Sequence, residues 1–452
     1  MKIRKLFLLA TLFIFASLFL FACSGGFSDA YPMPGVLDGE FGFAEDGYAV
    51  DAATSKVYGD YFARAGVDVS SYYHDGAYDF SGVTSEEMDE LIGEARENIN
   101  QIMAGQLTAS AYDDNLHFEF WQSLLRSGQT EEENGIFYEY ANKFVFNLKN
   151  RIKITVPSDL TCVISLKDGK NTKTITPNKE GIAYFYPESE AENYLVTVNY
   201  FKNGEALKEE ATVSGDYEFT LEGDNLAKDA IELMVVLDTT GSMGDEIRYL
   251  QVEIDNVIDR VKEQNPNTKI RLAVLVYRDK GDIYVTKYSD FSDDISVGRS
   301  FLEQQSAGGG GDFEEAVEVA LKEAASKDWS NETTTKIILH VADAPAHDGK
   351  IDEWNKVCYS LASKGIRIIN VASSGIDKKT EYFFRCECLI TNGIYTYLTN
   401  DSGIGGDHID ATTEDSVTVE LLNSMLVRLI SGMHTGDFGT PINYLQEISV
   451  EE

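Results

Sequence analysis

The stretch Ile231–Gly244, I-E-L-M-V-V-L-D-T-T-G-S-M-G, decides the fold that this chain is expected to adopt. Its first part, Ile231–Leu237, is an apolar run with the length and composition of a strand buried on both faces. An amphipathic helix is predicted over Asp245–Lys262, because apolar side chains recur there at helical spacing. A buried strand that leads directly into a helix is the repeating unit of a parallel sheet, so we expect an α/β fold.

Three polar residues, Asp238, Thr240 and Ser242, stand at alternate positions in the loop between that strand and that helix. In an open parallel sheet, ligands bind at the carboxyl ends of the strands, where this loop must lie. Carboxylate and hydroxyl oxygens are hard ligands, which suit Mg²⁺ better than zinc or copper. The alternative is that Asp238 only caps the helix while the hydroxyls bind its first amides.

The sequence D-T-T-G-S at Asp238–Ser242 matches the D-x-[ST]-x-S signature of the metal-ion-dependent adhesion site in von Willebrand factor type A (VWFA) domains. The resemblance implies a doubly wound, Rossmann-like domain over residues 230–432. It also implies one bound Mg²⁺ (or Mn²⁺ or Ca²⁺), with Asp343 as a further ligand because that residue directly follows the predicted strand Lys336–Ala342. In this family, the open position on the ion accepts a Glu or Asp from a partner protein.

The second metal-binding loop departs from the family pattern. The expected Thr is Gly311 here, and we assign the adjacent Asp312 to the metal by position, although it could instead cap a helix predicted over Phe313–Ser326. A carboxylate in place of a hydroxyl would partly neutralise the ion and weaken its attraction for an outside carboxylate. Arg278 and His347 are expected in loops at the same end of the sheet and could form the rim of a ligand site.

The rest of the second half alternates predicted strands and helices, as a doubly wound sheet requires. The segment Ile283–Ser289 follows the preceding strand after too short a link for a parallel crossover, so we expect it to pair antiparallel at the edge. A closing helix is predicted over Thr413–Ile430, and residues 433–452 are assigned to a tail. The parallel strands are predicted at Lys269–Tyr277, Lys336–Ala342, Ile366–Ala372 and, as the last one, Gly393–Leu398.

The start of the chain is typical of an exported protein. A basic segment precedes the apolar run Leu6–Phe21, and L-F-A-C ends at Cys23. This pattern resembles a bacterial lipoprotein signal, residues 1–22, with lipid attachment at Cys23; the alternative is an uncleaved helical anchor. Either reading places the body on the extracytoplasmic face of the cell membrane. Residues 23–82 lack a sustained period and are predicted to be a flexible tether.

Two smaller units are predicted between the tether and the α/β domain. Residues 83–150 are expected to be a helical segment, with a helix at Ser85–Met103, and Leu107–Trp121 resembles a lead-in found ahead of this module in bacterial surface proteins. The cluster Asp113–Asn115 could bind a cation or cap the next helix. Residues 151–222 alternate polar and apolar side chains between turn signals, which predicts an immunoglobulin-like all-β sandwich serving as a spacer.

Composition excludes several classes of function. The formal net charge is −37, and loss of the three leader cations leaves −40, so binding of nucleic acid by charge is not expected. Four cysteines follow Cys23, and their spacing fits no zinc site: Cys162, Cys358, Cys386 and Cys388. Buried free thiols are expected. The alternative of a disulfide from Cys358 to Cys386 or Cys388 stays open.

We therefore predict a membrane-anchored binding or adhesion protein, not an enzyme, which engages an extracellular or surface protein presenting an acidic residue. Two alternatives stay open. One is a scaffold or sensor that the metal only stabilises. The other is a metal-dependent hydrolase, which the absence of H-E-x-x-H, G-x-S-x-G and P-loop motifs disfavours.

Overall fold

The structure is a computed structural model, and it describes residues 55, 69–74, 77–81, 83–84, 87–88, 90–91, 104–126, 135–144, 148–225, 230–330 and 335–451. The signal, Cys23, most of the predicted tether and nearly all of the predicted helix Ser85–Met103 lie outside these residues. In the part of the tether that is described, a turn at Ser70–Tyr72 leads into two paired strands, β1 (Tyr73–His74) and β2 (Ala77–Tyr78). None of the helices within the described ranges has the length and apolar content that a membrane crossing requires.

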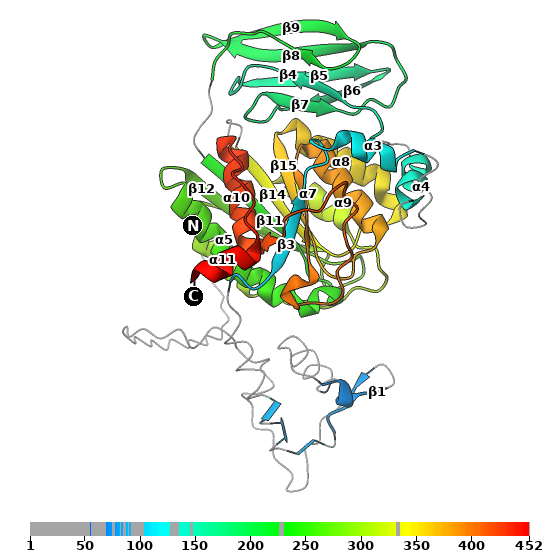
Figure 1. Ribbon diagram of the computed structural model, residues 1–452, viewed down its shortest axis with the longest axis vertical. Helices are drawn as coiled ribbons and strands as arrows, with labels where there is room; N and C mark the ends of the chain where they lie inside the picture. The colour runs from blue at the N-terminus through cyan, green and yellow to red at the C-terminus, as the bar shows by residue number, and fades with distance from the viewer. Residues whose placement is uncertain are drawn as a thin grey trace, which may run out of the picture.

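An eight-stranded sheet forms the centre of the larger body (Figure 1). Five neighbouring strands run parallel, and β13 pairs antiparallel at one edge, which confirms its predicted place. The strands lie in the order β13 (Thr286–Ser292), β12 (Lys269–Tyr277), β11 (Ala230–Asp238), β14 (Thr335–Ala342), β15 (Ile366–Ala372), β16 (Ile394–Leu398), β3 (Thr108–Tyr112) and β17 (Glu420–Leu421).

Strand β11 is central and fully buried, as its apolar run predicts. Alternate side chains along it enter two separate cores: Met234 and Val236 lie in one, Leu233 and Val235 in the other. In register with β12, Asp238 lies opposite Tyr277 at the carboxyl end of both strands. The sheet therefore delivers Asp238 to the edge where ligands of such folds bind.

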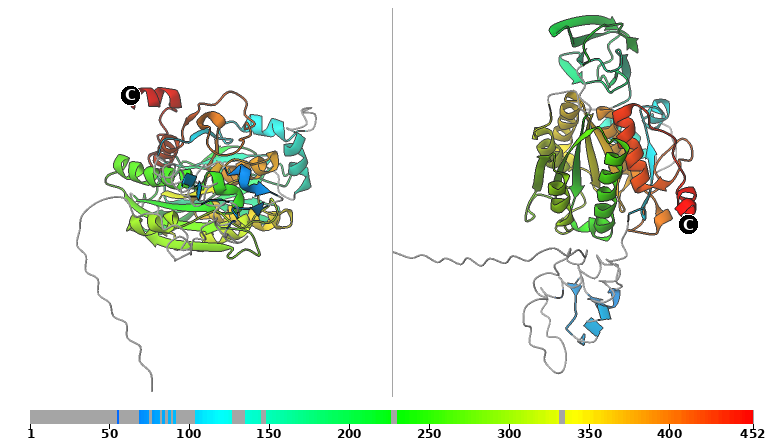
Figure 2. Two further views of the ribbon diagram at one scale, coloured as in Figure 1. Left: turned by 90° about the horizontal axis from the view of Figure 1, so that it is seen from below. Right: turned by 90° about the vertical axis from the view of Figure 1, so that its left-hand side faces the viewer.

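Helices cover both faces of the sheet, which confirms the doubly wound α/β architecture (Figures 1 and 2). One face packs against α5 (Ile247–Gln264), α6 (Ile295–Glu303) and α10 (Leu422–Thr435). The other packs against α7 (Val317–Ser326), α8 (Ile351–Ser363) and α9 (Lys378–Thr391). Short 3-10 turns and a last helix complete the domain: η2 (Gly241–Asp245), η3 (Asp348–Lys350), η4 (Asn400–Ser402) and α11 (Tyr444–Glu451).

The predicted closing helix was placed too early. Residues 413–419 form neither helix nor strand, β17 follows them, and the helix begins only at Leu422. The reason is tertiary: the backbone of Thr412 is bound by two side chains of α9, with its N–H donating to Glu381 at 2.7 Å and its carbonyl accepting from Arg385 at 2.6 Å.

The segment predicted as helical, 83–150, also contributes a strand to the main sheet. β3 pairs antiparallel with β16, and β17 pairs with its other side, so Gly393–Leu398 does not supply the last strand of the sheet. Two short helices follow, α3 (Phe118–Leu124) and α4 (Gly135–Lys143), and Trp121 of α3 stacks on Tyr382 of α9. This part of the chain is therefore built into the α/β domain.

Residues 152–218 form two small sheets that stand on the α/β domain near the amino ends of its strands (Figure 1). One contains β10 (Tyr217–Glu218), β4 (Ile152–Thr155) and β7 (Ile182–Phe185). The other contains β6 (Asn171–Ile175), β5 (Cys162–Asp168), β8 (Tyr194–Lys202) and β9 (Glu205–Val213). The predicted β unit is present, whereas its immunoglobulin-like character stays a prediction.

The four cysteines in the described ranges are free and buried, as expected. The alternative of a bridge from Cys358 is therefore not realised.

Candidate functional site

The first loop of the candidate site follows β11 and is ordered by its own side chains. The backbone N–H and hydroxyl of Thr240 both donate to Asp238 Oδ1, at 2.8 and 2.7 Å, and the hydroxyls of Thr240 and Ser242 lie 3.2 Å apart. Asp238 is fully buried, and its second oxygen, Oδ2, is buried without a hydrogen-bond partner. The three residues that the motif singled out thus face one point, and one carboxylate oxygen there is unsatisfied.

The loop after β14 brings Asp343 to the same point. Its Oδ1 is also buried without a hydrogen-bond partner, and the Ser242 side chain is close enough to favour its charged form. Burial raises the pKa of Asp343 to about 8, and the neighbouring Asp238 carboxylate adds to this effect. Burial is also the largest cause that raises the pKa of Asp238. Two neighbouring carboxyl groups whose charged forms burial disfavours need a proton or a cation between them.

The second loop contributes an acidic residue that sequence reasoning missed, Glu315. It is buried, its Oε2 has no hydrogen-bond partner, and burial followed by the Asp238 carboxylate raises its pKa to about 9. The glycine loop makes room for it: Gly310 has φ +79°, and a Cβ there would lie 3.2 Å from Glu315 Oε1 and 3.5 Å from Thr240. The departure from the family's Thr, followed by two Glu, was the available signal, but nothing in the sequence shows which Glu turns inward.

Asp312 is exposed, unlike the buried Asp238 and Asp343. Its side chain is 61% exposed, and its Oδ2 lies 3.6 Å from Nε2 of His347. The helix α7 begins at Val317 with Ala316 as its N-cap, so the alternative that Asp312 caps this helix is wrong.

The two predicted rim residues also separate. His347 is partly exposed and its Nε2 lies 3.7 Å from Asp279 Oδ2, and its place at the rim of a ligand site stays a prediction. Arg278, by contrast, is buried beneath the glycine loop, where it donates to the carbonyl of Ser306 at 2.7 Å and covers the ring of Tyr284. Arg278 therefore supports the second loop from inside, which corrects its predicted place at the rim.

A buried chain of hydrogen bonds lies behind the first loop. Tyr277 lies opposite Asp238 in the paired strands, and its hydroxyl lies 3.2 Å from Nε2 of His340. His340 Nδ1 in turn lies 2.9 Å from Glu387 of α9, which also accepts from the indole N–H of Trp354 at 2.7 Å. Such outer partners orient a ligand residue and limit its movement.

The donor set fits a hard divalent cation. Three buried carboxyl groups, those of Asp238, Asp343 and Glu315, each keep one oxygen without a hydrogen-bond partner beside two hydroxyls. Buried carboxylates are costly unless they are protonated, paired or bound to metal. Oxygen ligands of this kind match Mg²⁺, Mn²⁺ or Ca²⁺.

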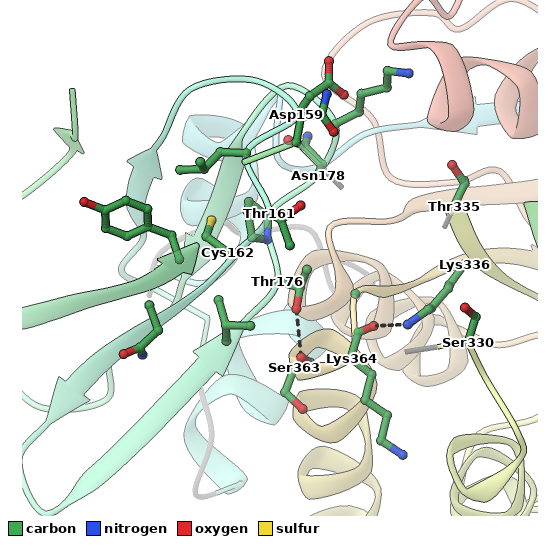
Figure 3. Close-up of a pocket in the computed structure, with 18 of the residues that line it drawn as sticks. Asp159, Thr161, Cys162, Thr176, Asn178, Ser330, Thr335, Lys336, Ser363 and Lys364 are labelled. Atoms are coloured by element: carbon green, nitrogen blue, oxygen red, sulfur yellow. Dashed lines mark hydrogen bonds between the residues drawn. The ribbon is translucent and has the colours of Figure 1, made fainter. Parts of the chain in front are cut away.

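A hollow of about 1170 Å³ lies away from these loops, between the small sheets and the amino ends of β14 and β15 (Figure 3). The hydroxyl of Thr176 donates to the carbonyl of Ser363 at 2.9 Å, and Lys336 donates to the carbonyl of Lys364 at 3.2 Å. Both bonds satisfy carbonyls at the C-terminal end of α8, and the bond from Thr176 joins the small sheets to the α/β domain. We therefore assign these residues to the junction.

Comparison with known proteins supports the domain that the motif predicted. Residues 232–407 match the family model of the von Willebrand factor A domain, which confirms such a domain in the second half of the chain. An ariadne-like RING finger protein of Acanthamoeba polyphaga mimivirus is 26% identical over 193 residues, 39% of this chain and 19% of that protein. The alpha-protein kinase vwkA of Dictyostelium discoideum is 25% identical over 163 residues, which are 35% of this chain and 25% of that protein. This chain thus spans a quarter or less of these relatives.

Solved structures give weaker similarities. BatB from Bacteroides thetaiotaomicron aligns with a TM-score of 0.32 at 14% identity, covering 45% of this chain and 98% of that one. The open form of the pilus adhesin SpaC from Lactobacillus rhamnosus GG aligns with a TM-score of 0.32 at 11% identity, covering 54% of this chain and 32% of that one.

Proposed function

We propose that this protein is a surface-anchored binding protein whose VWFA domain engages a protein ligand through a bound divalent cation. The observation that carries the proposal is the convergence of Asp238, Thr240, Ser242 and Asp343 at the carboxyl end of the sheet, with unsatisfied buried carboxylate oxygens. A protein-interaction role is the usual use of such a domain.

The cation would be held by the first loop and Asp343, with Glu315 as the acidic group from the second loop in place of the predicted Asp312. Magnesium requires six oxygen ligands and readily keeps waters, so a position remains for an oxygen of the ligand. Because three carboxyl groups already surround the site, the ion would attract an outside carboxylate weakly. Contacts around the loops must then supply most of the affinity.

The anchor belongs to the same proposal. Lipid attachment at Cys23 would hold the protein at the outer face of the membrane, and the residues up to about 82 would separate the binding domain from the bilayer. The ligand is then a protein of the cell surface or its surroundings that presents an acidic side chain. The strongly acidic body makes a broad charge-driven interface with such a ligand unfavourable.

The test compares capture of ligand proteins from extracellular material by the full chain in Mg²⁺ and in chelator. We expect capture in Mg²⁺, release by chelator and restoration by Mg²⁺ or Mn²⁺. Asp238→Ala should abolish capture. Asp290→Ala, which removes an exposed carboxylate from the edge strand, should not.

Two results would replace the proposal. Capture that ignores both chelator and Asp238→Ala would mean that the metal only stabilises a scaffold or sensor. Metal-dependent turnover of a phosphoester or peptide that Asp238→Ala removes would indicate a hydrolase.

A further inference from the structure

Three metal-ligating side chains converge beside the first site without belonging to its motif. Asp279 follows β12, Asp312 precedes α7 and His347 follows β14. Nε2 of His347 lies 3.7 Å from Asp279 Oδ2 and 3.6 Å from Asp312 Oδ2, and one potential ligand atom of each residue lies within 4.8 Å of the other two.

The backbone holds two of these loops together. The N–H of Glu315 donates to the carbonyl of Pro345 at 3.0 Å, and Glu315 forms a parallel bridge with Ala346. Asp312 and His347 are close neighbours of these bridged residues in sequence. Their proximity therefore follows from the fold and does not depend on two long side chains meeting by chance.

The Asp279 carboxyl group needs a partner that the protein only partly supplies. Asp279 is 9% exposed, one oxygen faces His347, and the other, Oδ1, is buried without a hydrogen-bond partner. Nδ1 of His347 is likewise buried without one.

The nearby basic side chains are engaged elsewhere. Lys280 bonds Glu318 at 2.7 Å, and Lys379 bonds Glu314 at 2.6 Å and Asp348 at 2.9 Å. Arg278 is held under the glycine loop by the carbonyl of Ser306. Within the described ranges, the negative charge of the Asp279 and Asp312 carboxylates can therefore be balanced only by a protonated His347 imidazole or by a bound cation.

We propose that Asp279, Asp312 and His347 form a second divalent-cation site, distinct from that of Asp238, which takes a borderline metal such as Zn²⁺. An imidazole nitrogen with two carboxylate oxygens is a ligand set typical of Zn²⁺, whereas the first site offers oxygen alone. Three protein ligands leave a fourth position for water or for a ligand atom.

The observed spacing is close to what zinc requires. With bonds of about 2.0–2.1 Å, the ligand atoms of a tetrahedral site lie about 3.3 Å apart. The two measured separations exceed this by a few tenths of an ångström. Asp312 is exposed, so its side chain can make up the difference without moving the core.

The proposal does not depend on the first site, and the test separates the two. Zn²⁺ alone is titrated into the full metal-free chain by calorimetry, and Co²⁺ is added in parallel as a spectroscopic probe for its visible absorption. His347→Gln and Asp312→Asn should each weaken zinc binding by at least about tenfold and reduce the cobalt absorption. Both positions are at least partly exposed, so the fold should survive, and an unchanged thermal transition checks this.

Matched variants make the result decisive. His74→Gln, which removes an exposed histidine elsewhere, should leave zinc binding unchanged. Asp238→Asn should abolish Mg²⁺ binding but keep the zinc site. Zinc binding that survives His347→Gln at full affinity, or that is lost in Asp238→Asn instead, would overturn the second site. Failure of Mg²⁺ binding in the wild type would refute only the first.

Discussion

Replacement of Asp114 by Ala should strongly destabilise the α/β domain, although Asp114 lies more than 100 residues before β11 in the sequence. Its carboxylate accepts from Nε and an NH₂ group of Arg385, at 2.9 and 2.5 Å. Arg385 is fully buried, and its guanidinium lies 5.2 Å from the ring of Trp121 and 5.5 Å from that of Phe137. The variant would leave a buried cation with only part of its hydrogen bonds.

The size of the effect follows from what remains. Removal of one partner of a buried ion pair typically costs about 3–5 kcal/mol of unfolding free energy. Glu381 still accepts from Arg385 at 3.0 Å, so the lower end, about 3 kcal/mol, is expected. For a domain of this size, that loss corresponds to a fall in melting temperature of about 6–12 °C.

The assay is thermal and urea unfolding of the full chain, with Asp415→Ala as a control that removes an exposed carboxylate. The double variant Asp114→Leu with Arg385→Met should recover only part of the loss. Apolar residues of similar size often replace a buried ion pair without cost, but Glu381 and the Thr412 carbonyl lose their bonds to Arg385. If Asp114→Ala melts within about 2 °C of the control, less than 1 kcal/mol is involved. The segment 104–126 would then not be integral to the domain.

Two further predictions concern buried titratable groups. Because burial raises the pKa of Glu315 from 4.5 to about 9, its contribution to stability is fully present below pH 4.5 and is lost as pH rises towards 9. In metal-free buffer, Glu315→Gln should therefore match the wild type near pH 4.5 and exceed its stability at pH 7 by about 1–3 kcal/mol. In saturating Mg²⁺ the order should reverse, and the same stability in both buffers would count against Glu315 lying in the metal site. Burial also raises the pKa of every cysteine thiol in the described ranges, namely Cys162, Cys358, Cys386 and Cys388. A thiol reagent should therefore label these residues only after unfolding. Rapid labelling of the native chain would contradict this packing.

Local pattern was sufficient to predict the parallel part of the sheet. The apolar runs at β11, β12, β14 and β15 are long and bounded by turns, and the short link before β13 allows only an antiparallel edge. Asp238, Thr240 and Ser242 were found the same way, because all three lie in one loop whose place follows from the strand before it.

The pairing of strands that lie far apart in the chain could not be predicted from the sequence. β3 joins the sheet because its backbone groups complete the ladder of β16 and because Asp114 neutralises the buried Arg385 on α9. The periodicity of the β3 segment does not indicate that it pairs with β16, and that of α9 does not indicate that Arg385 binds Asp114. The late start of α10 has the same cause, since side chains of α9 bind both backbone groups of Thr412 just before the predicted helix start.

Some candidate metal ligands could likewise be predicted from local sequence, whereas others depend on the tertiary structure. Asp343 follows directly from its strand, but the second loop required the tertiary structure: Glu315 turns towards Asp238, while Asp312 turns towards His347 and Asp279. Which carboxylate turns inward depends on the backbone of the glycine loop and on the bridge between Glu315 and Ala346. The sequence by itself therefore determined the parallel part of the sheet and the loop that ends its central strand. The tertiary structure decided which distant side chains meet at that loop, because contacts between segments far apart in the chain leave no local pattern.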